Sequence, residues 1–281
     1  MIENQFQIDD MIKRALDEDL GAGDITTGAI VDPRVKGKAV LLAKEDFVLA
    51  GGQVFARVFE LLEPEVVCRL FFQDGDKVTT RKIIGEVSGT IAVLLKGERT
   101  ALNFVQRMSG IATLTRHYVD KVGKNKAKIA DTRKTVPGLR LLDKYAVHTG
   151  GGYNHRRGLF DGVLIKDNHI VAAGSITRAV ESAKQHAPHT LKIEVEVQRL
   201  DQIEEAIMAG ADIVLLDNMN LDHLKNAVQM VRQRVLLEAS GGVNLNTVES
   251  IAATGVDIIS VGALTHSVKA VDISLELLPL E

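Results

Sequence analysis

The sequence predicts an α/β fold in which an N-terminal α+β unit precedes an α/β barrel with too few strands to close. After about residue 126, short apolar runs alternate with helical patterns, which is typical of parallel strands with helices outside them. Before that point, strand patterns cluster with only a few helices. The chain has no tryptophan and only 4% aromatic residues. Aliphatic side chains must therefore fill the core, which suits strands buried on both faces.

The barrel prediction depends on the number of strand candidates in the second half. They are KIADTRK, GVLIKDN, LKIEVEV, DIVLLDN, VLLEASGG and DIISVGA. A complete barrel of eight units typically needs ~250 residues, and only about 150 follow residue 126. We therefore expect a barrel of fewer than eight strands, which stays open. A flat, doubly wound parallel sheet is the alternative architecture.

The N-terminal part contains both helices and strands. Residues 8–20 and 52–62 have the apolar spacing of helices, and residues 38–52 are typical of paired strands. Residues 65–78 indicate a strand followed by an Asp-Gly turn. Residues 95–122 predict one long helix, or two helices separated near Gly110.

Charge and cysteine content exclude several classes of protein. A formal net charge of −3 argues against a general binder of nucleic acid. Cys68 is the single cysteine, so neither an intramolecular disulfide nor a cysteine-cluster metal site can form. The first 20 residues have no apolar signal core, and no run of about 18 apolar residues marks a membrane span. We expect a cytoplasmic protein that binds neither nucleic acid nor membrane.

Charged or phosphate-compatible residues follow each predicted barrel strand, at the ends where parallel α/β folds place their active sites. In chain order these ends carry DTRK (131–134), KDN (166–168), Glu194 and Glu196, Asp217 and Asn218, Glu238 and SGG (240–242), and Gly262 and Ala263. One polar strand end is ordinary, because loops are polar. Five or six at one face of the fold indicate a functional site.

Positive charge is concentrated in residues 133–166, although the whole chain is slightly acidic. The seven cations there are Arg133, Lys134, Arg140, Lys144, Arg156, Arg157 and Lys166. Clustered cations repel one another and are tolerated when they are solvated, paired, or facing an anionic ligand. An anion site is our prediction. The alternatives are a solvated basic surface, and Glu196 and Asp217 as structural partners of the cations.

Glycine-rich segments near the strand ends also suit anions. HTGGGYNHRRGLFDG (148–162) combines glycines, whose amides can approach an anion, with Arg156 and Arg157, which can grip a carboxylate. SGGV (240–243) and SVGAL (260–264) follow the last two strands, where barrels often bind phosphate. Each short motif is a weak signal alone, and a mobile loop has a similar composition.

These segments belong to a longer resemblance. The sequence resembles the quinolinate phosphoribosyltransferases, also called decarboxylating nicotinate-nucleotide pyrophosphorylases. The resemblance covers nearly the whole chain, and its most specific block is the continuous run from 131 to 169. The matching blocks are EDLGAGDITT (18–27), GERTALNFVQRMSGIAT (97–113), DTRKTVPGLRLLDKYAVHTGGGYNHRRGLFDGVLIKDNH (131–169), EVEV (194–197), LLDN (215–218), EASGGV (238–243) and SVGALTHS (260–267).

The resemblance implies a reaction and an architecture. The enzymes of this family transfer phosphoribose from phosphoribosyl pyrophosphate to quinolinate, and they release pyrophosphate and CO2 to give nicotinate mononucleotide for de novo NAD biosynthesis. Magnesium accompanies the pyrophosphate, and no organic cofactor is needed. The implied fold is an N-terminal α+β sandwich domain (1–112, joined by the tail 268–281) and an open seven-stranded α/β barrel (113–267). A homodimer or higher homo-oligomer shares its active sites between subunits.

The resemblance also implies the site residues. Lys134, Lys166, Glu196 and Asp217 are expected to be catalytic, and Glu196 and Asp217 are expected near the magnesium pyrophosphate. Arg99 is expected to enter the site of the neighbouring subunit. The remaining substrate-binding residues are expected to be Thr132, Arg133, His155, Arg156, Ser240, Gly241, Gly242, Val261, Gly262 and Ala263.

Three other functions remain as alternatives. A phosphoribosyltransferase of the same fold could act on another base, although the intact HRRG segment favours a dicarboxylate. The chain could instead be a class I aldolase, because Lys166 ends a strand, where those enzymes carry a Schiff-base lysine. A non-catalytic sensor of phosphoribosyl pyrophosphate would need an output domain, and the sequence shows no obvious one.

Overall fold

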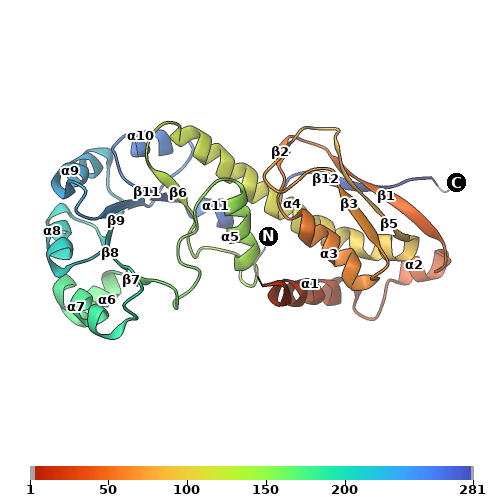
Figure 1. Cartoon of the computed structure of the whole chain (residues 1–281), viewed down its shortest axis with the longest axis horizontal. Coiled ribbons are helices and arrows are strands. Elements are labelled where there is room, and N and C mark those ends of the chain that lie inside the picture. Colours follow the sequence, from red (N-terminus) through yellow and green to blue (C-terminus); the bar gives the residue numbers. More distant parts are fainter. Residues whose placement is uncertain (1–3, 280–281) are drawn as a thin grey trace. The chain divides into compact units, whose positions relative to one another are not determined.

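The computed structural model describes residues 4–279, which divide into two compact units (Figure 1). The first comprises the chain up to Leu114, Val136–Gly151 and the chain from Val268 onward, and the second comprises Thr115–Thr135 and Gly152–Ser267. The sequence boundaries place residues 136–151 with the barrel, whereas the contacts group them with the first unit. None of the helices within 4–279 is long and apolar enough to cross a membrane.

The first unit is built on an antiparallel sheet. Its strands are β1 (Lys36–Ala43), β3 (Val67–Leu70), β5 (Ile83–Thr90) and β12 (Ile273–Leu277), in the order β12-β1-β5-β3. A separate pair joins β2 (Phe47–Val48) to β4 (Lys77–Val78). The two strands expected within residues 38–52 are both present. They do not pair with each other, because β5 and β12 occupy the two sides of β1.

Four helices accompany this sheet: α1 (Gln5–Leu20), α2 (Ile25–Ile30), α3 (Gly52–Leu62) and α5 (Arg140–Thr149). Helix α3 buries Val54, Phe55, Val58 and Phe59, which lie on one face at helical spacing. The rings of Phe55 and Phe59 meet edge to face, with their centroids 5.2 Å apart. Helices α1 and α3 confirm the two helices expected over residues 8–20 and 52–62.

Helix α4 (Ile91–Val122) is one continuous helix, which decides between the two possibilities for residues 95–122. Gly110 does not interrupt the helix but allows another segment to approach it. A Cβ atom at this position would lie 2.3 Å from the carbonyl oxygen of Lys269. The glycine is therefore required for packing of the C-terminal segment, and Val271 completes that contact by donating its N–H to the Gln106 carbonyl at 3.2 Å.

The second unit is a parallel sheet formed by all six expected strands. They are β6 (Lys128–Ala130), β7 (Val163–Ile165), β8 (Ile193–Val197), β9 (Ile213–Asp217), β10 (Leu236–Ser240) and β11 (Ile258–Ser260), in the order β6-β11-β10-β9-β8-β7. The first strand lies beside the last, as in a barrel. Within the described residues no ladder joins β6 to β7, so the barrel is open.

A seventh position exists at the open side of the barrel. Tyr153 forms an isolated parallel bridge with Ala130, on the edge of β6 that β11 leaves unpaired. Two hydrogen bonds hold it: the Tyr153 N–H donates to the Ile129 carbonyl at 2.7 Å, and the Asp131 N–H donates to the Tyr153 carbonyl at 3.0 Å. This segment is too short for its periodicity to be recognised in the sequence.

Side chains alternate between the two faces of the barrel strands. Val195, Val197, Val214 and Leu216 are buried under the helices. These helices are α6 (Asp167–Ala173), α7 (Ile176–His186), α8 (Leu200–Ala209), α9 (Leu221–Val231) and α10 (Val248–Ala252), and Figure 1 shows α7 to α10 outside the strands. The alternate positions face the barrel interior and are often charged. Because side chains alternate along each strand, one set packs against the helices and the other lines the barrel interior, where the site lies.

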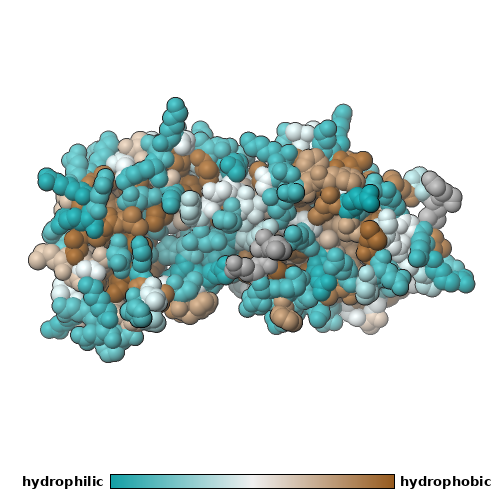
Figure 2. All heavy atoms as spheres, viewed as in Figure 1, coloured by the Kyte–Doolittle hydropathy of each residue, from teal (hydrophilic) through white to brown (hydrophobic). Residues whose placement is uncertain are grey.

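The surface of the chain mixes polar and apolar side chains. In Figure 2 hydrophilic groups cover much of the visible face of both units, and apolar groups lie among them. Some large apolar side chains are well exposed, including Phe6 at 87% and Ile25 at 87% in the first unit, and Phe160 at 79% in the second.

Candidate active site

A cavity of about 840 Å³ lies at the carboxyl ends of the barrel strands. Asn218, Glu238 and His266 also contribute to its wall; the first two were among the strand-end residues noted in the sequence, but none of the three was assigned a role. The expected site residues that line it are Thr132, Arg133, Lys134, His155, Arg156, Lys166, Glu196, Asp217, Ser240, Gly241, Gly242, Val261, Gly262 and Ala263. Segments far apart in the sequence thus form one wall, because parallel strands end at the same face.

The cations and carboxylates of the cavity lie close together. Lys166 Nζ is 3.4 Å from Glu196 Oε2, across the gap between β7 and β8. Partial burial, followed by the positive charge of Arg133, lowers the pKa of Arg156. A cavity that holds two guanidinium groups close enough to repel is suited to an anionic ligand, which would relieve that repulsion.

The loop that carries Arg156 is held by a buried carboxylate at the end of β6. Asp131 is fully buried and accepts hydrogen bonds from the His155 N–H at 2.9 Å and from Asn154 Nδ2 at 2.7 Å. Asp161 accepts from the N–H of Arg157 at 2.7 Å, which closes the other end of the loop. Carboxylates that accept backbone N–H groups thus define the conformation of the HRRG segment.

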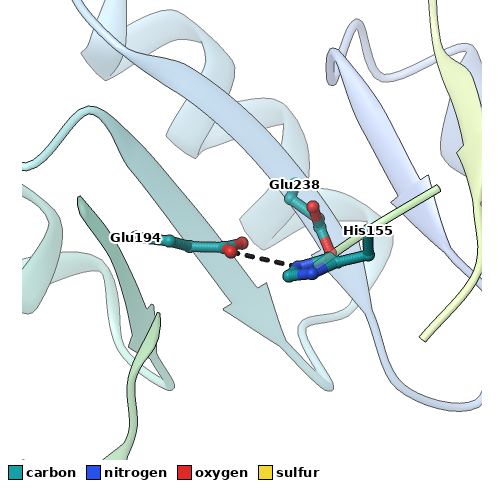
Figure 3. Close-up of side chains that lie close together, drawn as sticks. All are labelled: His155, Glu194 and Glu238. Carbon is teal, nitrogen blue, oxygen red and sulfur yellow. Dashed lines mark ion pairs between the residues drawn. The ribbon is translucent and has the colours of Figure 1, made fainter. Parts of the chain in front are cut away.

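Below this loop, His155, Glu194 and Glu238 meet inside the barrel (Figure 3). His155 Nε2 lies 3.0 Å from Glu194 Oε2 and 3.7 Å from Glu238 Oε1. Burial, followed by the charge of Glu194, raises the pKa of Glu238 from 4.5 to about 7. The atoms of these three residues that could bind a metal ion lie within 4.8 Å of one another. The 3.0 Å contact between His155 and Glu194, however, is a hydrogen-bond distance. We therefore interpret the group as a hydrogen-bonded cluster.

The sequence contained a signal for this cluster. Glu194 and Glu196 are separated by one residue on β8, so both face the barrel interior. Glu238 occupies an interior position on β10. The prediction assigned a function to Glu196 and none to the two deeper glutamates, because a strand-end pattern does not tell which carboxylate is buried.

The glycine-rich loops after β10 and β11 bring the backbone to the cavity wall. Gly241 has φ +94°, and a Cβ there would lie 2.1 Å from Asn218 Oδ1, so no other residue fits without displacement. Thr265 Oγ1 donates to the Lys134 carbonyl at 2.8 Å and thereby connects the second loop to the basic segment. Val261 donates its N–H to the Ala130 carbonyl at 2.9 Å, so this amide is used in the sheet and does not face a ligand.

Glu196 and Asp217 form the donor set that best fits magnesium. Both carboxylates line the cavity at the ends of adjacent strands, β8 and β9. Magnesium prefers oxygen ligands, and it is usually held by one or two carboxylates together with substrate phosphates and water. Asp217 Oδ2 also accepts from Asn218 Nδ2 at 3.0 Å, which orients this carboxylate.

Arg99 is the one expected site residue outside the cavity wall. It lies on α4 within the first unit, and its side chain is exposed. An exposed position is compatible with the expectation that it acts in a neighbouring subunit.

The fold and the site together define an α/β-barrel protein of the phosphoribosyltransferase type, with a cationic cavity and two carboxylates at the strand ends. Residues 24–109 match the profile of the quinolinate phosphoribosyl transferase N-terminal domain, and residues 111–276 match that of the C-terminal domain. The chain belongs to the quinolinate phosphoribosyltransferase family.

Similar proteins cover nearly the whole chain. A probable nicotinate-nucleotide pyrophosphorylase [carboxylating] of Bacillus subtilis (strain 168) is 44% identical over 97% of this chain and 94% of its own length. A chloroplastic nicotinate-nucleotide pyrophosphorylase [carboxylating] of Arabidopsis thaliana is 43% identical over 97% and 83%. The crystal structure of NadC from Streptococcus pyogenes is 45% identical and superposes with a TM-score of 0.95 over 99% of each chain.

Proposed function

We propose that this protein transfers phosphoribose from phosphoribosyl pyrophosphate to quinolinate with decarboxylation, giving nicotinate mononucleotide, pyrophosphate and CO2. The observation that carries the proposal is the single cavity that gathers Arg133, Arg156 and Lys166 with Glu196 and Asp217. Both substrates are multiply anionic, and a local cationic cavity lets a chain of net charge −3 bind them together.

The basic side chains divide between the two substrates. Arg156, with Arg133 beside it, is placed to bind the carboxylates of quinolinate. The loops at 240–242 and 261–263 hold the 5′-phosphate, with Gly262 and Ala263 contributing backbone at the wall. Lys134 lies between these regions, next to Gly262, and is placed to neutralise the departing pyrophosphate.

Glycosyl transfer requires stabilisation of charge on the sugar. The quinolinate nitrogen attacks C1 of the ribose as the bond from C1 to the pyrophosphate oxygen breaks. Positive charge then develops on the ribose, where Glu196 and Asp217 stabilise it electrostatically. Glu196 and Asp217 would also hold magnesium, which supplies Lewis-acid neutralisation of the pyrophosphate charge. Lys166, paired with Glu196, orients that carboxylate.

Decarboxylation follows from the product of the transfer. The ring nitrogen is cationic once it is bonded to C1, and it stabilises the carbanion that remains when the adjacent carboxylate leaves as CO2. A proton then replaces the carboxylate on the ring carbon. The ring itself thus serves as the electron sink, and the protein acts mainly through positioning and electrostatics.

We propose further that the functional unit is a homodimer or larger homo-oligomer to which Arg99 contributes across subunits. Exposure of Arg99 on α4 supports this arrangement.

The test is pyrophosphate release by the purified chain. We expect release that depends on both phosphoribosyl pyrophosphate and quinolinate, accompanied by equimolar CO2. Replacement of quinolinate by nicotinate, which lacks the carboxylate that is lost, separates this function from that of a related transferase. Equal or faster release with nicotinate would refute the assignment, and borohydride trapping of Lys166 with a carbonyl substrate would favour an aldolase.

A further inference from the structure

The two glutamates inside the barrel are costly features that the proposed chemistry leaves unused. Glu194 is 5% exposed and Glu238 is 2% exposed. Among the described residues, the Oε1 atom of each has no hydrogen-bond partner. Burying two carboxyl groups side by side costs free energy, because desolvation and their mutual repulsion disfavour the charged forms. Nearby interior positions on other strands carry Leu164 and Leu215, so the barrel accepts apolar side chains at this depth.

The hydrogen bonds of His155 fix where its proton lies. Its Nδ1 accepts the Arg156 backbone N–H at 2.8 Å, so that nitrogen carries no proton. Its Nε2 faces Glu194 Oε2 at 3.0 Å, and only a proton on Nε2 makes that contact favourable. The ring is therefore the neutral Nε2–H form, and both of its nitrogens are engaged by protein groups.

The same contacts connect the barrel interior to the substrate cavity. Glu194 lies at hydrogen-bond distance from the ring, with Glu238 beside it at 3.7 Å, and the ring accepts a hydrogen bond from the backbone N–H of Arg156. At its far end this guanidinium donates to the Gly162 carbonyl at 3.1 Å. Asp131 holds the His155 N–H from the opposite side. The backbone and the side chain of Arg156 are thus each anchored, and Glu194 supports the backbone anchor through the His155 ring.

We propose that Glu194, with Glu238 beside it, is a positioning residue for quinolinate, which acts by holding the His155 ring and thereby fixing Arg156 in its carboxylate-binding place. The inference rests on the proposed function, since it names quinolinate as the ligand whose affinity responds. It assigns His155 an indirect part, because neither ring nitrogen is directed to a ligand. Phosphoribosyl pyrophosphate is held at other walls of the cavity, so its affinity should not depend on the contact between Glu194 and His155.

The first experiment measures the Kd of quinolinate and of phosphoribosyl pyrophosphate separately for Glu194→Leu and Glu194→Gln. Leucine fills the volume but cannot accept a hydrogen bond, and we expect quinolinate to bind about 10-fold more weakly. Glutamine retains an acceptor oxygen, and we expect less than about a 3-fold change. The Kd of phosphoribosyl pyrophosphate should change little in both variants.

A matched control and a double-mutant cycle test whether the effect passes through Arg156. Glu205 accepts hydrogen bonds from Thr177 on the outside of the barrel, so Glu205→Leu should lower thermal stability without changing quinolinate affinity. In an Arg156→Ala background, Glu194→Leu should have almost no further effect on quinolinate binding. Additive effects of the two substitutions would mean that Glu194 acts independently, and would overturn the proposal.

A spectroscopic measurement keeps the proposal testable if Glu194→Leu fails to fold. Nitrogen-15 NMR of the histidine-labelled wild-type protein should show His155 as the neutral Nε2–H tautomer. A ring protonated at Nδ1 could not accept the Arg156 N–H, and this result would overturn the proposal. If the wild-type protein binds no quinolinate at all, the proposed function fails, while the tautomer measurement still judges the geometry.

Discussion

Two layers of acidic side chains line the same barrel and differ in how their charge is compensated. Glu196, in the upper layer, faces Lys166, whose side chain is 48% exposed at the cavity mouth. Glu194 lies two residues earlier on β8, deeper by roughly 6–7 Å, and faces the His155 ring inside the barrel. The upper carboxylates line the cavity, where a substrate can reach them, whereas the lower ones lie in a buried cluster with His155. On the same strand, Glu196 is thus proposed to act on the substrate and the deeper Glu194 to position other residues.

The largest expected effect belongs to the upper layer. Glu196→Gln removes the charge that faces the sugar and the partner of Lys166. We expect kcat to fall by about 100-fold or more, as for loss of one group that stabilises transition-state charge. Steady-state kinetics with both substrates saturating measure this, and Glu194→Gln serves as the comparison. Equal loss of kcat in both variants would remove the distinction between the layers.

The next effect concerns the carboxylate-binding arginine. Arg156→Ala should weaken quinolinate binding by about 10- to 150-fold, the range for one charge-assisted hydrogen-bonded contact. The adjacent Arg157 is the matched control, because it does not line the cavity at the strand ends. Arg133→Ala should behave like Arg156→Ala. Isothermal titration with quinolinate decides, and an equal effect of Arg157→Ala would refute the assignment.

A third prediction concerns sharing of sites between subunits. Arg99→Ala should abolish activity, and so should Lys134→Ala, because each removes a cation from a different part of the composite site. After co-expression or subunit exchange, a mixed dimer contains one intact site, and we expect up to about a quarter to a half of wild-type activity to return. Mixed dimers that form and stay inactive would show that the sites are not shared.

The smallest expected effect is on stability in the lower layer. The pKa of Glu238 is raised from 4.5 to about 7, so the folded chain binds this proton more tightly than the unfolded chain does. The resulting stabilisation is present below pH 4.5 and is lost as the pH rises through 7. Relative to Glu238→Gln, the wild-type free energy of unfolding should fall across this window by on the order of 3 kcal/mol at most.

Urea unfolding of both proteins between pH 4.5 and 8 measures that difference. Curves that stay parallel over the whole range would show that Glu238 does not gain a proton on folding. Burial of Glu238 would then not favour its protonated form, and the comparison between the layers would lose its physical basis.

Much of the barrel was predictable because its signals are local. Six apolar runs separated by helical patterns gave all six strands, and polar residues at their ends predicted the cavity wall. The strand at Tyr153 was not predictable, since one bridged residue has no periodicity. The pairing of β1 with β12 was equally hidden from local pattern, because it joins segments more than 200 residues apart in sequence.

The lower layer of the site was harder to predict than the upper one. Sequence alternation places Glu194 and Glu196 on the same face, but only the structure shows that one reaches solvent and the other reaches His155. The direction of the His155 ring depends on a backbone N–H one residue away, and no residue pattern encodes that contact. The direction of this hydrogen bond depends on the folded conformation of the loop and cannot be read from its composition.

The position of β12 has a consequence for synthesis of the chain. The sheet of the first unit uses residues near both ends of the sequence, with β12 hydrogen-bonded along β1 from Ala39 to Ala43. A growing polypeptide therefore cannot complete this sheet until Ile273–Leu277 has left the ribosome, more than 200 residues after β1 has been made. In the interval β1 presents an unpaired edge, which is a template for association with other nascent chains.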